Sequence, residues 1–344
     1  MTASSQPETA ILPRRRATCP PPDARVLLTS MNPRAGSRAR HETADAIHEA
    51  LANRGYEVHT TTNLDHLKEL AIACQKSGEL RAIVAMGGDG TAAIVRKHTP
   101  LDVPLVPVPM GTENLLGRYV GQITTPQAVC QTIDDGVIIS LDLGRAGDKI
   151  FLLMMSAGFD AEVVRSLHAR RRGNIGRSTY LWHIVRAMRS YVYPPMRLYL
   201  QPDGDVRPPP RVCRWIFGFN LPLYAFGLPI APDAVGTDGL LDVCTLERGR
   251  FTSILRYLWY VARKAHLTLP DAAVCRAARF RLEPTSEAIV AYQIDGDYGG
   301  TLPVEVEVLG GQLRLLVPRE TAHRLGFIIN LPPGATDRPP YEQL

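Results

Sequence analysis

Two periods of apolar residues alternate along residues 25–142 of the 344-residue chain. Short apolar or alternating runs predict strands, and runs with apolar residues every three to four positions predict helices. Strands are expected at residues 26–30, 56–60, 82–86 and 105–108, and helices at residues 41–53, 64–75 and 92–97. Because strands and helices alternate, we expect an α/β domain, in which helices cover a parallel sheet.

The second half of the chain has a different pattern, in which short strands follow one another between Gly and Pro turns. Nine strands are expected, at residues 138–142, 150–155, 197–201, 212–219, 240–246, 277–282, 289–293, 304–308 and 313–317. Two helices interrupt them, at residues 180–192 and 251–266. This pattern predicts a β-sandwich-like domain.

Four segments follow from these patterns. An α/β domain is expected at residues 25–142 and a β-rich domain at residues 143–320. The Pro- and Arg-rich residues 1–24 are expected to be a disordered leader, and residues 321–344 a loose C-terminal tail.

Composition excludes several classes of protein. A hydrophobic fraction of 45% with 21% charged residues is too apolar for a disordered chain. No apolar run approaches the ~18–20 residues of a membrane-spanning helix, and no apolar segment near the N-terminus resembles a signal peptide. The six cysteines are scattered without a Cys-x-x-Cys pair, which indicates reduced thiols rather than disulfides or zinc ligands. We therefore expect a cytoplasmic protein.

Charge is concentrated in one segment. The net charge of the chain is only +5, yet residues 161–197 hold eight arginines and a single acid, Glu162. Arg170, Arg171 and Arg172 form the centre of this segment, and the expected amphipathic helix 180–192 follows. Such a patch fits an anionic membrane surface or a phosphorylated product, and we expect peripheral membrane association. A solvated face or an RNA-compatible patch is the alternative, although no nucleic-acid partner is expected.

The most informative motif is Gly87-Gly88-Asp89-Gly90-Thr91, which lies between an expected strand and an expected helix. Glycines allow a tight turn and a close approach of the backbone to a ligand. The helix N-terminus that follows favours an anion. Because Asp89 would repel a bare phosphate, its carboxylate suggests a role with Mg²⁺ or with the proton of a hydroxyl. The alternative is an ordinary glycine-rich turn.

Two further turns follow neighbouring strands. Gly111, Thr112 and Asn114 follow the strand at 105–108, and Asn32, Pro33 and Gly36 follow the strand at 26–30. Ligands of open α/β sheets bind at the carboxyl ends of the strands, so three such turns favour one shared site. The sheet has neither a P-loop nor a Gly-x-Gly-x-x-Gly fingerprint, which disfavours both classes.

Together these motifs resemble the diacylglycerol kinase catalytic-domain family, which includes bacterial lipid kinases and the sphingosine and ceramide kinases. The resemblance extends into the second half, at residues 156–163, 230–243 and 293–297. Gly-Gly-Asp-Gly-Thr is shared with NAD kinases, but Asp-Gly-Leu-Leu-Asp at 238–242 and Asp-Gly-Asp at 295–297 distinguish the two families.

The resemblance implies ATP-dependent phosphorylation of a hydroxyl of a diacylglycerol-like or sphingoid lipid, with ATP and Mg²⁺. Asp89 would act through Mg-ATP, Asp297 would be the general base, and Asp160 would contact the lipid substrate. The nucleotide site implied by the resemblance comprises Asn32, Thr62, Gly87, Gly88, Asp89, Gly90, Thr91, Gly111, Thr112 and Asn114.

Three departures from the family pattern keep alternatives open. Ala93-Ile94 replaces the usual Asn-Glu, Leu115 follows Asn114 where Asp is common, and Asp297 is one methylene shorter than the usual Glu. A small-molecule kinase similar to NAD kinases and a non-catalytic nucleotide- or lipid-binding relative are therefore the alternatives. The sequence also leaves a homodimer open.

Asp238 is a candidate ligand of a structural Mg²⁺ or Ca²⁺, together with Asp242 and nearby carbonyls. The alternative is a turn before a strand, since Asp238-Gly239 is typical turn chemistry. The sequence does not decide between them.

Overall fold

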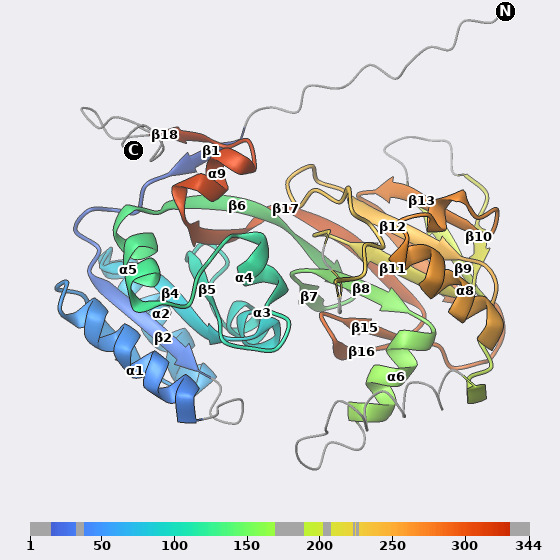
Figure 1. The fold of residues 1–344 in the computed structure, drawn as a ribbon, viewed down its shortest axis with the longest axis horizontal. Helices are drawn as coiled ribbons and strands as arrows, with labels where there is room; N and C mark the ends of the chain where they lie inside the picture. The colour runs from blue at the N-terminus through green and yellow to red at the C-terminus, as the bar shows by residue number, and fades with distance from the viewer. Residues whose placement is uncertain are drawn as a thin grey trace, which may run out of the picture.

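The computed structural model describes residues 15–31, 38–168, 189–201, 208–222, 224 and 227–330. Within them the N-terminal part is a parallel sheet with helices on both faces (Figure 1). Its strands lie side by side in the order β5 (Leu105–Pro109), β4 (Leu80–Gly87), β2 (Val26–Met31) and β3 (Glu57–Thr60). One face is covered by α1 (Arg38–Ala52) and α5 (Pro126–Asp135), and the other by α2 (Leu64–Ser77) and α3 (Asp89–His98).

Burial on both faces explains why the parallel strands are apolar throughout. Along β4, Ile83 and Ala85 pack in the core beneath α2 and α3, whereas Val84 and Met86 pack in the core beneath α1 and α5. Successive strand residues point to opposite faces, so neither set of positions can be polar.

The second half contains an antiparallel sheet of six strands. Their order is β13 (Ala272–Ala277), β12 (Leu241–Leu246), β11 (Trp215–Phe219), β8 (Met154–Ala157), β15 (Ala291–Ile294) and β16 (Asp297–Thr301). One face packs on β9 (Met196–Leu200), β10 (Arg211–Cys213), β14 (Arg279–Pro284) and β17 (Val304–Val317). Ile216 and Val243 meet Phe280 and Val306 in the core between the two sheets. The expected β-sandwich-like domain is confirmed.

Two long strands, β6 (Val137–Ala146) and β17, run through both halves of the molecule (Figure 1). They pair antiparallel with each other along most of their length, with a register shift between Leu309 and Leu313. The first half of β17 pairs with β14 in the sandwich, and Leu315 pairs in parallel with Leu105 of β5. The two domains therefore share one continuous sheet. The C-terminal part of the domain expected at residues 143–320 packs with the layers of the N-terminal domain.

The expectation of irregular ends is wrong for two segments that the structure describes. Strand β1 (Arg16–Thr18), within the expected leader, pairs in parallel with β18 (Ile328–Asn330), within the expected tail. Helix α9 (Arg319–Arg324) precedes β18. These strands have only three residues each, so they have no readable apolar period. Pairing with β6 and complete burial of Ala17 hold β1 in place.

Several element limits also differ from the expectation. The strand expected at 150–155 is two strands, β7 (Lys149–Phe151) and β8, and that at 212–219 is divided at Arg214 into β10 and β11. Conversely, the strands expected at 304–308 and 313–317 are the single strand β17. The helix expected at 251–266 ends earlier, as α8 (Phe251–Ala262), and a 3-10 turn follows at His266–Thr268.

Sequence patterns missed α4 (Leu115–Tyr119), α5, α6 (Phe159–His168), β13 and β16. Most of the helix expected at residues 180–192, up to residue 188, lies outside the described residues.

Candidate active site

The glycine turns after β4 and β5 touch each other at one edge of the parallel sheet. Gly87 ends β4, and Gly88 is the N-cap of α3. A Cβ atom on Gly111 would lie 2.3 Å from the Cα atom of Gly88, so a side chain at Gly111 would collide with the backbone of the other turn. The expected convergence of these two turns is thus present in the structure.

Asn114 closes the second turn. It adopts the left-handed conformation, with φ of 53°, which Asn tolerates better than most residues. Its Oδ1 accepts a hydrogen bond from the amide of Gly111 at 2.6 Å, and its Nδ2 donates to the carbonyl of Gly111 at 3.0 Å. These contacts give Asn114 a role in shaping the turn.

Asp89 connects α3 to α4. Its two carboxylate oxygens accept hydrogen bonds from the amides of Leu115 and Leu116, at 2.9 and 2.8 Å, at the N-terminus of α4. A carboxylate has about four lone-pair positions, so these two bonds leave room for a cation. Asp89 can therefore hold the start of α4 and still offer an oxygen ligand to a cation.

The N-terminus of α3 fits an anionic ligand. No side chain among the described residues caps this end of the helix, and a Cβ atom on the exposed Gly90 would meet nothing within 4 Å. The first amides of a helix and its dipole favour a phosphate at such a position. Residues of the glycine turns therefore fit the phosphates of a nucleotide, with Asp89 beside them as an oxygen ligand of the kind Mg²⁺ prefers.

Four further residues belong to the nucleotide site that the sequence predicts. Thr112 is exposed in the second glycine turn, and Thr91 is buried in the first turn of α3. Thr62 is exposed and follows β3, whose carboxyl end lies at the same sheet edge. Asn32 lies outside the described residues.

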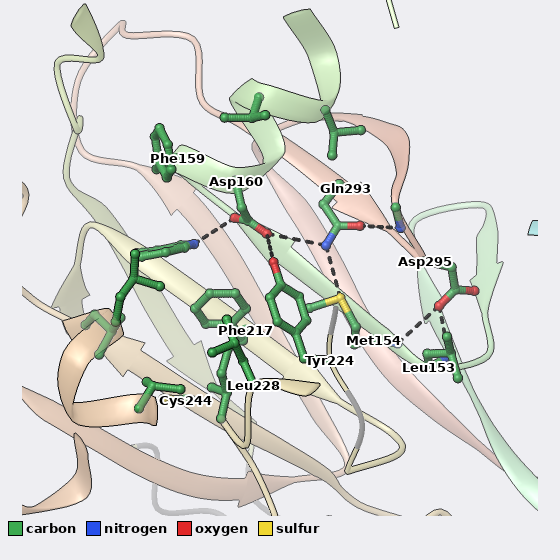
Figure 2. A pocket seen from close by; sticks show the side chains of 18 of the residues that line it. Leu153, Met154, Phe159, Asp160, Phe217, Tyr224, Leu228, Cys244, Gln293 and Asp295 are labelled. Carbon is green, nitrogen blue, oxygen red and sulfur yellow. Dashed lines mark hydrogen bonds between the residues drawn. The ribbon is translucent and has the colours of Figure 1, made fainter. Parts of the chain in front are cut away.

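An apolar cavity of about 580 Å³ extends from this edge into the second domain. Figure 2 shows Phe159, Phe217, Leu228 and Cys244 around it. Apolar side chains from β8, α6, β11, β12 and α8 form its wall: Met154, Phe159, Val163, Trp215, Phe217, Cys244, Leu246, Tyr257, Leu258 and Val261. Its volume falls within the range of about 300–1,000 Å³ typical of small-molecule sites.

Acidic residues from both domains line the cavity. Asp89 and Glu113 come from the glycine edge, and Asp295 and Gly296 come from the turn between β15 and β16. A molecule whose apolar part fills the cavity can therefore place a polar group beside the glycine turns. Sequence reasoning missed Glu113 and Asp295, although Asp295-Gly296 lies within a motif that supported the resemblance.

Asp295 organises the turn. It has a positive φ of 49°, and its carboxylate accepts hydrogen bonds from the amides of Leu152, Leu153 and Met154, at 2.7, 2.9 and 3.1 Å. Burial raises the pKa of Asp295 to about 6, and the three amide hydrogen bonds only partly oppose this effect. Asp297, the predicted base, is the first residue of β16 and is not among the residues that line the cavity.

Asp160 lies in the cavity wall within a polar cluster (Figure 2). Its carboxylate accepts hydrogen bonds from the Ser156 hydroxyl, from Trp215 Nε1 at 2.7 Å, from the Tyr224 hydroxyl at 3.4 Å and from Gln293 Nε2 at 3.5 Å. Burial raises the pKa of Asp160, although the hydrogen bonds from Ser156, Trp215 and Gln293 oppose the shift. The structure thus brings Asp160 and Asp89 to one cavity.

Asp238 has the contacts of a turn residue. Its Oδ1 accepts a hydrogen bond from the amide of Leu240 at 3.0 Å, just before β12. Burial raises the pKa of its carboxyl group. No group of three or more His, Cys, Asp or Glu side chains that could hold a metal occurs among the described residues. The turn alternative therefore has direct geometric support, and the structural metal stays a prediction.

Two observations concern membranes. Arg170, Arg171 and Arg172 lie outside the described residues, so the expected basic patch stays a prediction. In the described part of the chain, no helix combines the length and apolarity needed to cross a bilayer.

Comparison with known proteins agrees with this architecture. Residues 26–146 match the diacylglycerol kinase catalytic domain, and residues 154–317 match the YegS C-terminal NAD kinase beta sandwich-like domain. A glycine-rich α/β domain that shares a sheet with such a sandwich and borders an apolar cavity defines a class of two-domain kinases.

The chain belongs to the diacylglycerol kinase family, as its resemblance to that family indicated. It is 30% identical to a diacylglycerol kinase of Mycobacterium tuberculosis over 300 residues, which cover 84% of this chain and 94% of that one. A diacylglycerol kinase of Bacillus subtilis is 24% identical over 312 residues, 86% of this chain and 97% of that one.

A solved structure of a diacylglycerol kinase from Bacillus anthracis strain Sterne has the same fold. Its TM-score is 0.61 at 18% identity, and the match covers 87% of this chain and 98% of that chain. At this identity, the likeness concerns the fold alone.

Proposed function

We propose that this kinase transfers a phosphoryl group from ATP to the hydroxyl of a diacylglycerol-like or sphingoid lipid. The observation that carries the proposal is the cavity, whose wall is apolar and whose lining includes Asp89 beside the glycine turns. Burying an acyl chain there is favourable by about 25 cal/mol per Å² of apolar surface removed from water. NAD has no long apolar chain that could fill such a cavity.

Each part of the site would have a separate role in the transfer. Bound Mg-ATP supplies the transferable phosphoryl group. The N-terminus of α3 and the turns at Gly88 and Gly111 would hold the phosphates, and Asp89 would provide an oxygen ligand beside them. The cavity excludes water and orients the lipid with its hydroxyl towards this edge, which supplies much of the catalysis in phosphoryl transfer.

The proton of the lipid hydroxyl needs an acceptor. On the family resemblance we assign this role to the carboxylate of Asp297, two residues after the cavity-lining Asp295. The polar cluster around Asp160 would contact the head group of the lipid.

The test is phosphoryl transfer from labelled ATP to a panel of diacylglycerol, a sphingoid base and NAD. We expect label in a lipid and none in NAD. Asp89→Asn should lower the rate by about 100-fold or more, because it removes a charge next to the transferred group. Asp65→Asn is the matched control, since Asp65 is an exposed aspartate in the first turn of α2.

Two results would contradict the proposal. Label in NAD alone would favour a small-molecule kinase similar to NAD kinases. ATP binding without transfer to any acceptor would favour a non-catalytic relative, as the residues Ala93-Ile94 and Asp297 allow.

A further inference from the structure

Helix α8 lies between the apolar cavity and the outside of the molecule, and it carries apolar side chains on both sides. Tyr257, Leu258 and Val261 line the cavity. On the opposite side, the residues Leu255 and Trp259 are 47% and 51% exposed. Residues four positions apart lie on one face of a helix, so Leu255 and Trp259 form one exposed apolar stripe. We call this stripe, together with Arg250, Arg263 and Lys264 at its two ends, the α8 outer face.

Cations flank this stripe at both ends. Arg250 precedes α8, Arg263 and Lys264 follow it, and all three are exposed. The Arg263 guanidinium lies 3.7 Å from the centroid of the Trp259 ring, a cation–π contact. The helix contains no acidic residue. The nearby Asp271 already pairs with Arg248 and Arg256, and no ion pair of Arg250, Arg263 or Lys264 occurs among the described residues.

We propose that the α8 outer face docks on the surface of an anionic lipid bilayer. Trp and aliphatic side chains enter the interfacial region of a bilayer, while Arg and Lys beside them bind anionic head groups. The other side of the same helix lines the cavity, so docking would bring the bilayer within one helix width of the site for the acceptor lipid. The inference rests on the proposed function, because it explains how a lipid could pass from the bilayer to the cavity.

Charge favours a membrane over a second copy of this chain as the occupant of the α8 outer face. In a two-fold symmetric dimer the same patch lies on both partners. Arg250, Arg263 and Lys264 of each copy would then face like charges, which opposes association. An anionic bilayer instead complements these three cations.

The experiment measures co-sedimentation of the full chain with vesicles made of equal parts phosphatidylcholine and phosphatidylglycerol. The double variant Leu255→Ser/Trp259→Ser should bind about tenfold or more weakly, because it removes the apolar stripe. Arg263→Gln/Lys264→Gln should lose the preference for these vesicles over pure phosphatidylcholine. The matched control is Ile123→Ser, which replaces an apolar residue of the N-terminal domain that is 60% exposed.

A second measurement separates this inference from the proposed function. Phosphorylation of diacylglycerol in detergent micelles should be unchanged in the Leu255→Ser/Trp259→Ser variant, whereas phosphorylation in vesicles should fall with binding. Thermal unfolding confirms that each variant is folded. Vesicle binding equal to the wild type in a folded double variant would overturn the docking surface and leave the kinase proposal intact. Loss of a dimer in that variant, with vesicle binding unchanged, would assign the α8 outer face to a second copy.

Discussion

Asp295 shows how much a single carboxylate can hold in place at the cavity. It accepts hydrogen bonds from three successive amides, Leu152 to Met154, and its own backbone has a positive φ. The hydrogen bonds hold the turn between β15 and β16 against the start of β8 and the two residues before it, and the positive φ shapes the turn itself. Burial disfavours the charged form, which raises the pKa of Asp295 to about 6.

This shift makes a prediction about pH. The pKa of Asp295 is higher in the folded state than the ordinary value of 3.8, so its protonation stabilises the fold. The contribution is fully present below about pH 4 and is lost as the pH rises through about 6. The advantage of the wild type over Asp295→Asn in free energy of unfolding should therefore shrink by about 2 kcal/mol between pH 4 and 7. Urea unfolding at several pH values measures it, and a constant difference would contradict the assignment.

At the scale of elements, the two glycine turns act as one unit. The turn after β4 begins α3, the turn after β5 leads into α4, and Asp89 joins the two helices. Their backbones are so close that Gly111 has no room for a Cβ atom, whereas Gly90 faces open space. One glycine is thus needed for packing, and the other leaves room for a ligand.

The two glycines should respond differently to alanine. Gly111→Ala should lower the free energy of unfolding by about 2–3 kcal/mol, because the new methyl group collides with the backbone of Gly88. Gly90→Ala should leave stability unchanged or slightly raised, since alanine favours a helix. If the nucleotide phosphates lie at the N-terminus of α3, Gly90→Ala should nevertheless weaken ATP binding. Thermal unfolding and a nucleotide titration separate these effects, and a stable Gly111→Ala variant would refute the packing role.

Asp142 acts at the scale of the whole molecule. It is fully buried in β6, one of the two strands shared by both domains. Its carboxylate accepts hydrogen bonds from the amides of Gly239 and Gly311, each at 2.7 Å, and from Arg15 at 3.0 Å. These partners come from the start of the described chain, from the loop before β12 and from the bulge of β17. One side chain therefore connects three segments that are far apart in sequence.

Replacing Asp142 should be costly. Asp142→Asn should lower the free energy of unfolding by about 3 kcal/mol or more, because an amide cannot accept all these hydrogen bonds and leaves buried donors unpaired. Arg15→Ala should cost about 1 kcal/mol, since the Arg15 side chain remains 31% exposed in its ion pair with Asp142. Urea unfolding of both variants tests the ranking, and equal losses would contradict it.

The alternation of strands and helices in the first half can be predicted from the residues alone, because parallel strands buried on both faces must be apolar throughout. The class of the second domain and the glycine turns can be predicted in the same way, since short strands and tight turns leave local signals. Residue motifs were enough to indicate the family. All of these features depend on residues close together in the chain.

Contacts between segments that are far apart in the chain could not be predicted in this way. Arg16–Thr18 forms a strand because Ile328–Asn330 and β6 lie beside it, and no local pattern specifies that pairing. Likewise, β17 joins the two domains by pairing with β5 and β14 at its two ends. The cavity brings Asp89, Asp160 and Asp295 to one site although more than 60 residues separate each from the next. Such contacts arise from packing across the whole chain, because a side chain's neighbours in space are set by which strands pair.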